Sequence, residues 1–477
     1  MKVLFVTSEA YPFIKTGGLG DVSYSLPKEL KKLGIDVRVI LPKYSEVSSN
    51  FKSKMKQIDS YSVPVGWRNS YCGLQYLEYE GIPFYFVDNE YYFKRHVSYG
   101  FYDDGERFAF FCRAILESIG HMGDFTPDVI HLNDWQTGMI PVLLNEHYKK
   151  NGQLLNTKTM FTIHNLKYQG VFPKEILEDL LSLSWDYFKE DALKYYDAVS
   201  FMKGGINFSD LITTVSKTYV NEVKTPFYGE GLHGLLNSLG NKFSGIVNGI
   251  DFQLYNPNND KAIWKNYNEN NIKSKIVNKL ELQKLLNFPV NKDIPVIGIV
   301  SRLVKQKGFD LVAQVIEELL SLDLQIVVLG TGEENFEDLF EYYSSIYPSR
   351  ISSNIYFSSD LAQKIYAGSD MFLMPSLFEP CGIGQLIALR YGTIPIVRET
   401  GGLKDTVVPY NEFTDEGNGF SFANYNGCEM INIIKYALSI YRNKDKWEKL
   451  VKNAMKENNS WENSAREYRD LYYSLIK

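Results

Sequence analysis

The sequence predicts an α/β protein built from two units, each with a parallel sheet and crossover helices. At the N-terminus an apolar strand, a glycine-rich turn, an amphipathic helix and a second strand follow one another. The same succession restarts near residue 293. The chain has 477 residues, of which 44% are hydrophobic, so it can form two or three domains that each bury a core.

The first half is predicted to contain a βαβ unit at its start. Residues 3–7 form an apolar run that is typical of a buried parallel strand, and the helix at 22–33 ends at Gly34. Further along this half, strands are predicted at 36–42, 82–88, 127–134 and 157–165, and a helix at 106–120.

The second half repeats this architecture without an internal sequence repeat. We expect the boundary between the halves at residues 243–249, and a final amphipathic helix at 461–477. A helix is predicted at 309–322, and strands are predicted at 293–303, 324–332, 353–359, 371–376 and 393–399.

Composition excludes several classes of protein. The net charge of −6, with basic and acidic residues interleaved, argues against a nucleic-acid-binding protein. The four cysteines are far apart, so neither a disulfide framework nor a zinc module is expected. No stretch has the length of a membrane span, and a cytoplasmic enzyme or binding protein is predicted.

The glycine-rich turn after the first strand is the first candidate site. Lys15 and Gly18 lie in "KTGGLGD", between a strand and a helix. Free backbone N–H groups and a lysine at this position suit a phosphate or another anion. The alternative is a tight turn that needs glycine for positive φ.

A second candidate follows the first strand of the second half. Arg302 and Lys307 in "SRLVKQKG" lie between a strand and a helix, where two cations can bind a diphosphate. The alternative is a solvated pair of surface charges.

Glu379 lies in a turn that contains Cys381, Gly382 and Gly384, directly before an apolar helix. A carboxylate beside free amides is typical of sugar-hydroxyl recognition. The alternatives are a carboxylate that stabilises the helix dipole and, for Cys381, a small buried residue. "TGG", with Thr400 and Gly401, is a second possible anion nest.

Polar residues also end two strands of the first half. Asp134 follows one strand, and His164 and Asn165 follow another, while Asn248 lies at the inferred domain boundary. A single histidine is usually a structural hydrogen-bonding group, but two polar clusters at strand ends in one domain favour a ligand site.

The sequence has no HExxH, GxSxG, GxGxxG or Asp-x-Asp motif, so no metal site is predicted. Without a metal ion, cations of the protein itself must stabilise the charge of a leaving group.

An ordered set of motifs resembles the bacterial glycogen synthase and plant starch synthase family. Its members run from the N-terminus to the "WENSAREY" tail, so that the resemblance covers almost the whole chain. The motifs are, in order, "KTGGLGDV", "NDWQTG", "FTIHNLKYQG", "TPFYGEGLHGLL", "VNGID", "RLVKQKG", "EPCGIGQL" and "TGGLKDTV".

The resemblance implies a GT-B glycosyltransferase with two Rossmann-like domains facing across a deep cleft. Residues 1–245 would form the acceptor-side domain, 246–457 the nucleotide-sugar domain, and 458–477 a helix that crosses back to the first. The implied reaction transfers glucose from ADP-glucose to the non-reducing end of an α-1,4-glucan, with retention of anomeric configuration and without a metal or other cofactor. Neither a nucleic acid nor a membrane is an expected partner, and the oligomeric state stays open.

The resemblance also implies roles for individual residues. Arg302 and Lys307 would stabilise the departing diphosphate, His164 would hold the glucose near the reacting carbon, and Glu379 would bind its hydroxyls. These four residues are the expected catalytic set. The implied substrate-binding residues are Lys15, Gly18, Asp21, Asp134, Asn165, Asn248, Phe357, Cys381, Gly382, Gly384, Thr400 and Gly401.

Within that set, Lys15, Gly18, Thr400 and Gly401 would bind phosphates, and Phe357 would lie against the nucleotide base. Because a double displacement needs a carboxylate nucleophile and Glu379 belongs to the sugar-binding group, we expect same-face attack through an oxocarbenium-like state. Many related transferases carry a second glutamate eight residues after the first, and here that position is Ile387.

Three alternatives stay open at this point. The donor could be UDP-glucose, because an aromatic residue such as Phe357 stacks on any base. The enzyme could be a GT-B transferase with another acceptor or a nucleotide-sugar epimerase. The chain could also bind glucan without turning it over.

Overall fold

The computed structural model describes residues 1–476, and the chain divides into two compact units. Unit 1 comprises Met1–Val215, Val220–Ile246 and the segment from Trp461 onward, while unit 2 comprises Ser216–Tyr219 and Val247–Ser460. None of the helices in residues 1–476 has both the length and the apolar character needed to span a bilayer.

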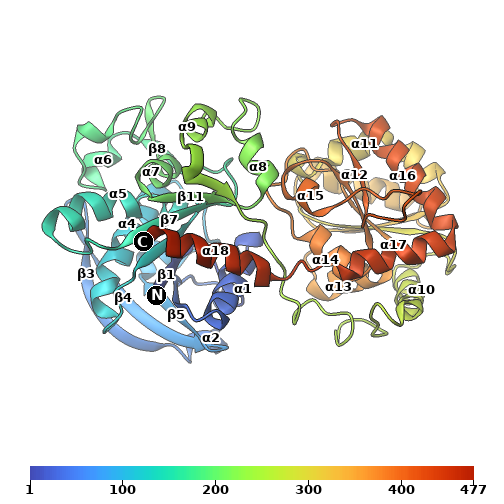
Figure 1. Cartoon of the computed structure of the whole chain (residues 1–477), viewed down its shortest axis with the longest axis horizontal. Coiled ribbons are helices and arrows are strands. Elements are labelled where there is room, and N and C mark those ends of the chain that lie inside the picture. The colour runs from blue at the N-terminus through green and yellow to red at the C-terminus, as the bar shows by residue number, and fades with distance from the viewer. Residues whose placement is uncertain (477) are drawn as a thin grey trace. The chain divides into compact units, whose positions relative to one another are not determined.

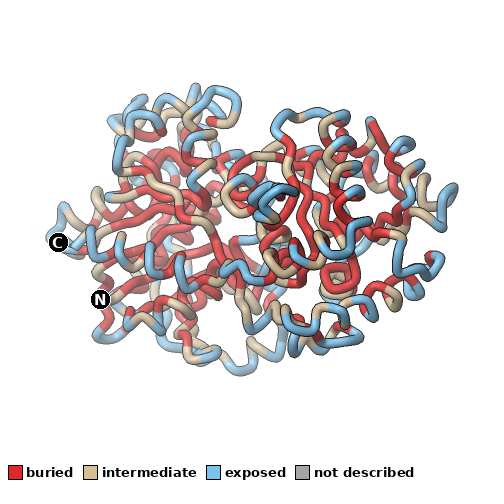
Figure 2. Tube along the Cα trace, turned by 45° about the vertical axis from the view of Figure 1, so that its right-hand side comes forward, coloured by how far each residue is buried: buried red, intermediate tan, exposed pale blue. Residues whose placement is uncertain are grey.

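Unit 1 is built on a nine-stranded sheet within the described residues, in the order β12-β11-β7-β6-β1-β2-β5-β4-β3. From β12 to β5 the neighbouring strands are parallel, and most of their residues are buried, as the colouring of the Cα trace in Figure 2 shows. The strands are β1 (Lys2–Val6), β2 (Asp36–Pro42), β3 (Lys56–Val65), β4 (Arg68–Tyr79), β5 (Ile82–Asp88), β6 (Val129–Asn133), β7 (Lys158–Ile163), β11 (Leu211–Thr214) and β12 (Phe243–Gly245).

The prediction of a purely parallel sheet is wrong at one edge of unit 1. Strands β3 and β4 form a hairpin, and β4 pairs antiparallel with β5. The hairpin was missed because β3 is largely exposed and lacks the apolar run of a buried strand. Its turn requires Gly66, whose φ is +56° and where a Cβ would lie 1.8 Å from the carbonyl oxygen of Asp179.

A small antiparallel sheet in unit 1 also escaped prediction. Its order is β8-β10-β9, and its members have only two or three residues each, too few for a periodic pattern. They are β8 (Val171–Pro173), β9 (Lys194–Tyr195) and β10 (Ala198–Ser200).

The first helix, α1 (Gly18–Lys32), begins four residues before the predicted start at residue 22. Glycine is a poor helix former, so the pattern at Gly18 and Gly20 did not indicate a helix. The other helices of unit 1 are α2 (Ser49–Lys52), α3 (Glu90–Phe93), α4 (Asp104–Ser118), α5 (Ile140–Leu143), α6 (Ile176–Asp179), α7 (Phe201–Phe208) and α9 (His233–Ser238), and α8 (Lys217–Glu222) spans the boundary between the units.

The last helix, α18 (Trp461–Ile476), belongs to unit 1 although the chain reaches it from unit 2 (Figure 1). It packs against α1, and its Tyr468 and Tyr472 are fully buried. The hydroxyl of Tyr472 lies 2.6 Å from Nδ1 of His131 in β6, and Nε2 of that histidine lies 2.7 Å from the hydroxyl of Thr162 in β7. Helix α18 therefore completes the core of unit 1.

Unit 2 has a six-stranded parallel sheet within the described residues, in the order β15-β14-β13-β16-β17-β18. The strands are β13 (Val296–Val300), β14 (Gln325–Leu329), β15 (Ile351–Asn354), β16 (Met371–Met374), β17 (Ile394–Arg398) and β18 (Phe420–Phe422). The helices are α10 (Lys275–Leu285), α11 (Phe309–Ser321), α12 (Glu334–Ile346), α13 (Ser359–Gly368), α14 (Gly384–Arg390), α15 (Gly401–Thr406), α16 (Gly427–Arg442) and α17 (Lys444–Lys456).

The predicted strand at 353–359 is shifted in the structure. Strand β15 ends at Asn354, and α13 begins at Ser359, where the hydroxyl of Ser358 accepts a hydrogen bond from the backbone N–H of Leu361. Phe357 therefore lies in a loop between a strand and a helix rather than in a strand.

Candidate active site

The predicted site residues follow neighbouring strands in each unit. In unit 1, Lys15, Asp134 and His164 follow β1, β6 and β7, which are adjacent in the sheet. In unit 2, the loops that begin after β13, β16 and β17 carry Arg302, Glu379 and Thr400, and these strands are adjacent too. Because parallel strands end at the same edge, each unit gathers its polar residues there, where ligands bind in open α/β sheets.

Asp134 organises the site of unit 1. Its Oδ1 accepts hydrogen bonds from the backbone N–H groups of His164 and Asn165, at 2.7 and 3.4 Å. Its backbone has φ 58° and ψ 178°, a conformation that costs free energy in any residue other than glycine and that recurs at functional sites. Burial raises the pKa of this carboxyl to about 7.

His164 is held as a neutral imidazole. Burial lowers its pKa to about 3. Its Nε2 lies 2.9 Å from Oδ1 of Asn133, and Nδ2 of that asparagine donates to the carbonyl oxygen of Val6. Since the oxygen of Asn133 can only accept, Nε2 of His164 is the donor, and Nδ1 is left as an acceptor for a substrate hydroxyl.

The glycine-rich loop is tied to the sheet by a residue that the sequence analysis missed. Glu9 is buried just beyond β1, and its carboxylate accepts from the backbone N–H groups of Thr16 and Gly20, at 2.6 and 3.1 Å. The lysine of the loop, Lys15, forms an ion pair of 2.8 Å with Asp21, whose pKa is raised by burial. The sequence does contain a signal for this role of Glu9: a glutamate directly follows the first strand and precedes a glycine-rich turn.

Three of the family motifs meet at one pocket of unit 1, which has a volume of about 380 Å³. Trp135 comes from "NDWQTG", Tyr168 from "YQG" and Glu230 from "GEGL". Gly170 is required at this place, because its φ is +58° and a Cβ would lie 2.2 Å from the indole of Trp135. The pocket combines aromatic rings with polar groups, a lining that suits a small polar ligand.

In unit 2 the structure brings Lys307 and Glu379 together. Nζ of Lys307 lies 2.5 Å from Oε2 of Glu379, and the hydroxyl of Ser376 donates to the same oxygen at 3.2 Å. Both charged side chains are largely buried. Arg302 is exposed at the end of β13 and forms no ion pair with any residue in the described range 1–476.

The two glycine motifs of unit 2 form one structure. The backbone N–H of Gly402 donates to the carbonyl oxygen of Glu379 at 3.2 Å. At Gly401, with φ +44°, a Cβ would lie 1.9 Å from the same oxygen. Gly384 is the first residue of α14, and Thr400 precedes α15. The loops that the sequence presented as separate sites therefore pack backbone against backbone.

Asn248 and Cys381 are also neighbours in unit 2. The backbone of Asn248 hydrogen-bonds the thiol of Cys381, whose pKa is raised to about 12 by burial. Asn248 is only 6% exposed, and its buried Oδ1 has no hydrogen-bond partner among the described residues. A buried oxygen of this kind is a candidate ligand contact.

Phe357 is the predicted residue that the structure leaves apart. Its ring is 88% exposed and lies in the loop between β15 and α13. The part of the chain that the structure describes also contains no cluster of three or more His, Cys, Asp or Glu residues arranged to hold a metal ion.

Comparison with known proteins identifies relatives over the whole chain. Residues 2–238 match the family described as starch synthase catalytic domain, and residues 285–457 match glycosyl transferases group 1. Glycogen synthases of Caldicellulosiruptor saccharolyticus and Caldicellulosiruptor bescii are each 59% identical to this chain. Each alignment covers 100% of this chain and 100% of the relative.

A solved structure is similar as well. The catalytic domain of starch synthase IV from Arabidopsis thaliana, bound to ADP and acarbose, superposes with a TM-score of 0.93 and 34% sequence identity. The match covers 99% of each chain. This likeness confirms the predicted α/β fold class with its two Rossmann-like domains.

Proposed function

The chain belongs to the bacterial glycogen synthase and plant starch synthase family, and from that membership we propose its donor, its acceptor and the residues that act on them. It is a glucosyltransferase with the GT-B fold. It transfers glucose from ADP-glucose to the non-reducing end of an α-1,4-glucan, with retention of configuration. We propose that it does so without a metal ion, and in the cytoplasm.

The observation that carries the proposal is the buried pair of Lys307 and Glu379 beside the glycine loops of unit 2. We assign Lys307 and the exposed Arg302 to the departing diphosphate, because fixed cations stabilise charge that develops in the transition state. Glu379 is oriented by Lys307 and Ser376, so its carboxylate can accept hydrogen bonds from glucose hydroxyls.

The glycine loops supply the remaining donor contacts. We assign the amides of Cys381, Gly382 and Gly384 to the sugar, and Thr400 and Gly401 to the distal phosphate. The unpartnered oxygen of Asn248 supports its assignment to a sugar hydroxyl. Phe357, whose exposed ring is free to stack, is assigned to the nucleotide base.

Unit 1 contributes hydrogen-bonding groups at the ends of β6 and β7, and one lysine in its glycine-rich loop. Nδ1 of the neutral His164 can accept a hydrogen bond from the transferred glucose, and Asp134 fixes the backbone of His164 and Asn165. We assign the pocket beside Trp135 to the acceptor glucan. Lys15 and Gly18 are assigned to phosphate groups of the donor, and Asp21 to holding Lys15.

The role of Glu379 decides which reaction mechanism we propose. Glu379 is oriented for sugar binding, so we propose no covalent glycosyl-enzyme intermediate. The bond from the anomeric carbon to the diphosphate breaks, and the acceptor hydroxyl forms its bond on the same face. The proton of that hydroxyl passes to the leaving phosphate, and the protein supplies geometry and charge.

Initial rates on a glycogen primer, with ADP-glucose and UDP-glucose in parallel, test the proposal. We expect turnover with ADP-glucose and much slower turnover with UDP-glucose. Preference for UDP-glucose would contradict the donor assignment but leave the reaction intact. Absence of turnover with either donor would contradict the proposed function itself.

A further inference from the structure

A buried arginine lies among the donor loops of unit 2. Arg398 is the last residue of β17 and is only 6% exposed. Burying a guanidinium costs hydration free energy, which the surrounding groups must offset with hydrogen bonds of their own. The groups that surround Arg398 therefore indicate what it does.

The guanidinium binds the backbone of the loop that follows β16. Its Nε donates to the carbonyl oxygen of Ser376 at 2.7 Å, and its Nη2 donates to the carbonyl oxygen of Leu377. Its Nη1 donates to the carbonyl oxygen of Ala423, directly after β18, at 3.3 Å. Because a guanidinium is planar and its donors point in fixed directions, it holds these three oxygens in one geometry.

One face of the guanidinium is restrained as well. It lies over the ring of Tyr425, with its carbon 5.7 Å from the ring centroid. The hydroxyl of Tyr425 donates to Asp310 in the first turn of α11, and this helix begins two residues after Lys307. Arg398 is thus connected to both sides of the ion pair formed by Lys307 and Glu379.

The loop that Arg398 holds also orients the carboxylate of Glu379. Ser376 is 1% exposed, and its hydroxyl donates to Oε2 of Glu379 at 3.2 Å. The guanidinium fixes the backbone of Ser376, so it also fixes the position from which this hydroxyl donates. A change at Arg398 should therefore reach the carboxylate through Ser376.

The loop assigned to phosphate depends on Arg398 in a different way. The backbone N–H of Thr400 donates to the backbone carbonyl oxygen of Arg398 at 2.9 Å. This hydrogen bond does not involve the guanidinium, so it survives replacement of the side chain. Contacts to the sugar and contacts to the phosphate should then respond differently to such a replacement.

We propose that Arg398 is a positioning residue for the glucose half of the donor, and that it acts through Ser376 on Glu379. The inference rests on the proposed function, because it takes ADP-glucose as the donor. Arg398→Lys is the informative replacement, since a lysine keeps the charge but has no planar set of donors that could hold three carbonyl oxygens.

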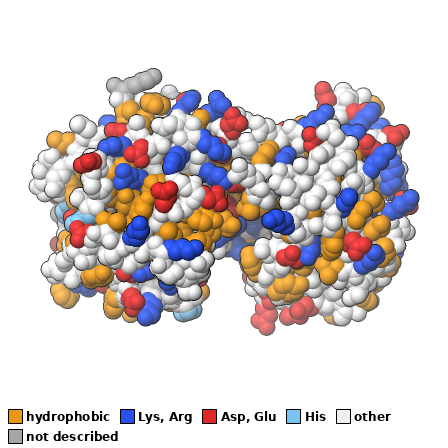
Figure 3. Space-filling view, turned by 90° about the horizontal axis from the view of Figure 1, so that it is seen from below, with side chains coloured by type: hydrophobic (Ala, Val, Ile, Leu, Met, Phe, Trp, Pro, Cys, Tyr) orange, Lys and Arg blue, Asp and Glu red, His pale blue; other side chains and the backbone are white. Residues whose placement is uncertain are grey.

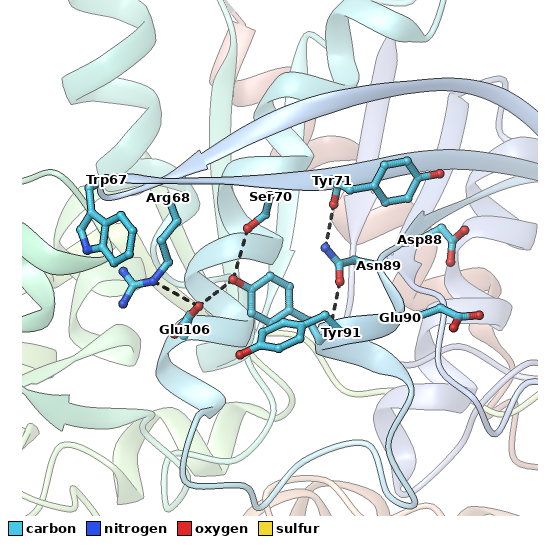
Figure 4. Close-up of a pocket in the computed structure, with 10 residues that line it drawn as sticks. Trp67, Arg68, Ser70, Tyr71, Asp88, Asn89, Glu90, Tyr91 and Glu106 are labelled. Atoms are coloured by element: carbon cyan, nitrogen blue, oxygen red, sulfur yellow. Dashed lines mark hydrogen bonds and ion pairs between the residues drawn. The ribbon is translucent and has the colours of Figure 1, made fainter.

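A matched arginine in unit 1 provides the control. Arg68 lines a cavity of about 660 Å³, together with Trp67 and Glu106, that shares no lining residue with the pocket beside Trp135 (Figure 4). Its guanidinium also donates to a backbone carbonyl oxygen, that of Asp179, at 3.1 Å. Arg68→Lys therefore makes the same chemical change at a distance from every donor loop.

Calorimetric titration with ADP and with ADP-glucose, in the absence of any glucan, tests the proposal. We expect Arg398→Lys to bind ADP-glucose about tenfold more weakly, as when a hydrogen bond to a charged group is lost, and to bind ADP with little change. Added to Glu379→Gln, the same replacement should weaken binding little further, because its effect passes through that carboxylate. Arg68→Lys should leave both affinities unchanged.

Equal weakening of ADP and ADP-glucose binding in Arg398→Lys would show a general structural role and overturn the proposal, as would additive losses in the double variant. Ser376→Ala removes only the linking hydroxyl, so it serves as the test if Arg398→Lys does not fold, and unchanged affinity for ADP-glucose would then overturn the proposal. Because the titration needs no turnover, the expected result in a protein that elongates no glucan would contradict only the proposed function. A wild-type protein that binds neither nucleotide would contradict both.

Discussion

The two units use the same structural device, polar loops after adjacent parallel strands, but fill it with different chemistry. Apart from the Lys15–Asp21 ion pair of its glycine-rich loop, unit 1 presents a neutral imidazole and a carboxyl whose pKa burial raises to about 7. Unit 2 presents an ion pair and an exposed arginine. The difference separates two tasks of a sugar transfer, because neutral groups suit hydroxyls and fixed cations suit a diphosphate.

The environment produces this difference, and the residue types alone do not. His164 and Lys307 are both basic side chains at strand ends, yet burial without a carboxylate partner leaves His164 neutral, while Glu379 lies 2.5 Å from the amine of Lys307. Surface charge does not separate the units in the same way, since Lys, Arg, Asp and Glu side chains are interspersed on the face shown in Figure 3.

The largest effect is expected where the cations of unit 2 are removed. Arg302→Ala and Lys307→Ala should each cost roughly 2–4 kcal/mol of transition-state stabilisation, because fixed charges act mainly on the developing diphosphate. The measurement is kcat with ADP-glucose beside glucan affinity. An unchanged kcat would contradict the assignment.

Thermal unfolding of the same two variants sharpens the comparison. Lys307→Ala leaves the buried Glu379 without its cation and should lower Tm, whereas Arg302 is exposed and its removal should leave Tm unchanged. Equal losses of Tm would show that the kinetic loss in Arg302→Ala is a folding effect.

The next largest effect is expected from a steric clash in unit 1 and not from the loss of a charge. Gly170→Ala should destabilise the protein by about 1–3 kcal/mol, because the new Cβ collides with the ring of Trp135. Gly152→Ala is the control, since Gly152 also has positive φ (80°) but a Cβ there would have no atom within 4 Å. Urea unfolding measures both, and equal losses would assign the effect to φ alone.

A smaller effect concerns the pH dependence of unit 1. The pKa of Asp134 is raised on folding, so the unfolded chain releases this proton at a lower pH than the folded one. The contribution of Asp134 to stability is thus complete below about pH 4 and is lost as the pH rises through about 7, with a slope of up to about 1.4 kcal/mol per pH unit.

Asp134→Asn keeps an oxygen for the two backbone N–H groups and removes the titration. Relative to this variant, the wild type should lose unfolding free energy between about pH 5 and pH 8. Denaturant unfolding at the two pH values measures the difference, and parallel curves would contradict the raised pKa.

Removal of divalent metal ions is expected to have no effect on the rate. If the cations of unit 2 carry the charge of the leaving group, EDTA should leave the rate with ADP-glucose unchanged. Loss of activity with EDTA that a divalent ion restores would contradict the metal-independent mechanism.

Much of the fold could be predicted because parallel strands are apolar on both faces, which makes them visible as runs in the sequence. The hairpin β3–β4 could not, since its strands are polar on their exposed side and their pairing depends on Gly66 and the distant Asp179. The start of α1 was placed late because its first turn is held by Glu9 and not by helix propensity.

The candidate site, like the fold, could be predicted only in part from the sequence. Residues next to strand ends were found by position, and the motif order indicated their family. The contact of Gly401 with Glu379 and the tautomer of His164 depend on residues far apart in the chain, so no local pattern contains them. The cavity lined by Trp67 was not predicted because its residues come from the β3–β4 hairpin, β5, α3 and α4, which are separate in the sequence.

Because helix α18 comes last in the chain but belongs to unit 1, the order of synthesis affects how unit 1 folds. The ribosome completes the sheet of unit 1 about two hundred residues before it releases the helix whose tyrosines cover His131. At translation rates of about 5–20 residues per second, the nascent sheet waits on the order of tens of seconds with that apolar surface uncovered. A chain that stops short of Trp461 would keep it uncovered permanently, and such a fragment is a natural substrate for chaperones and proteases.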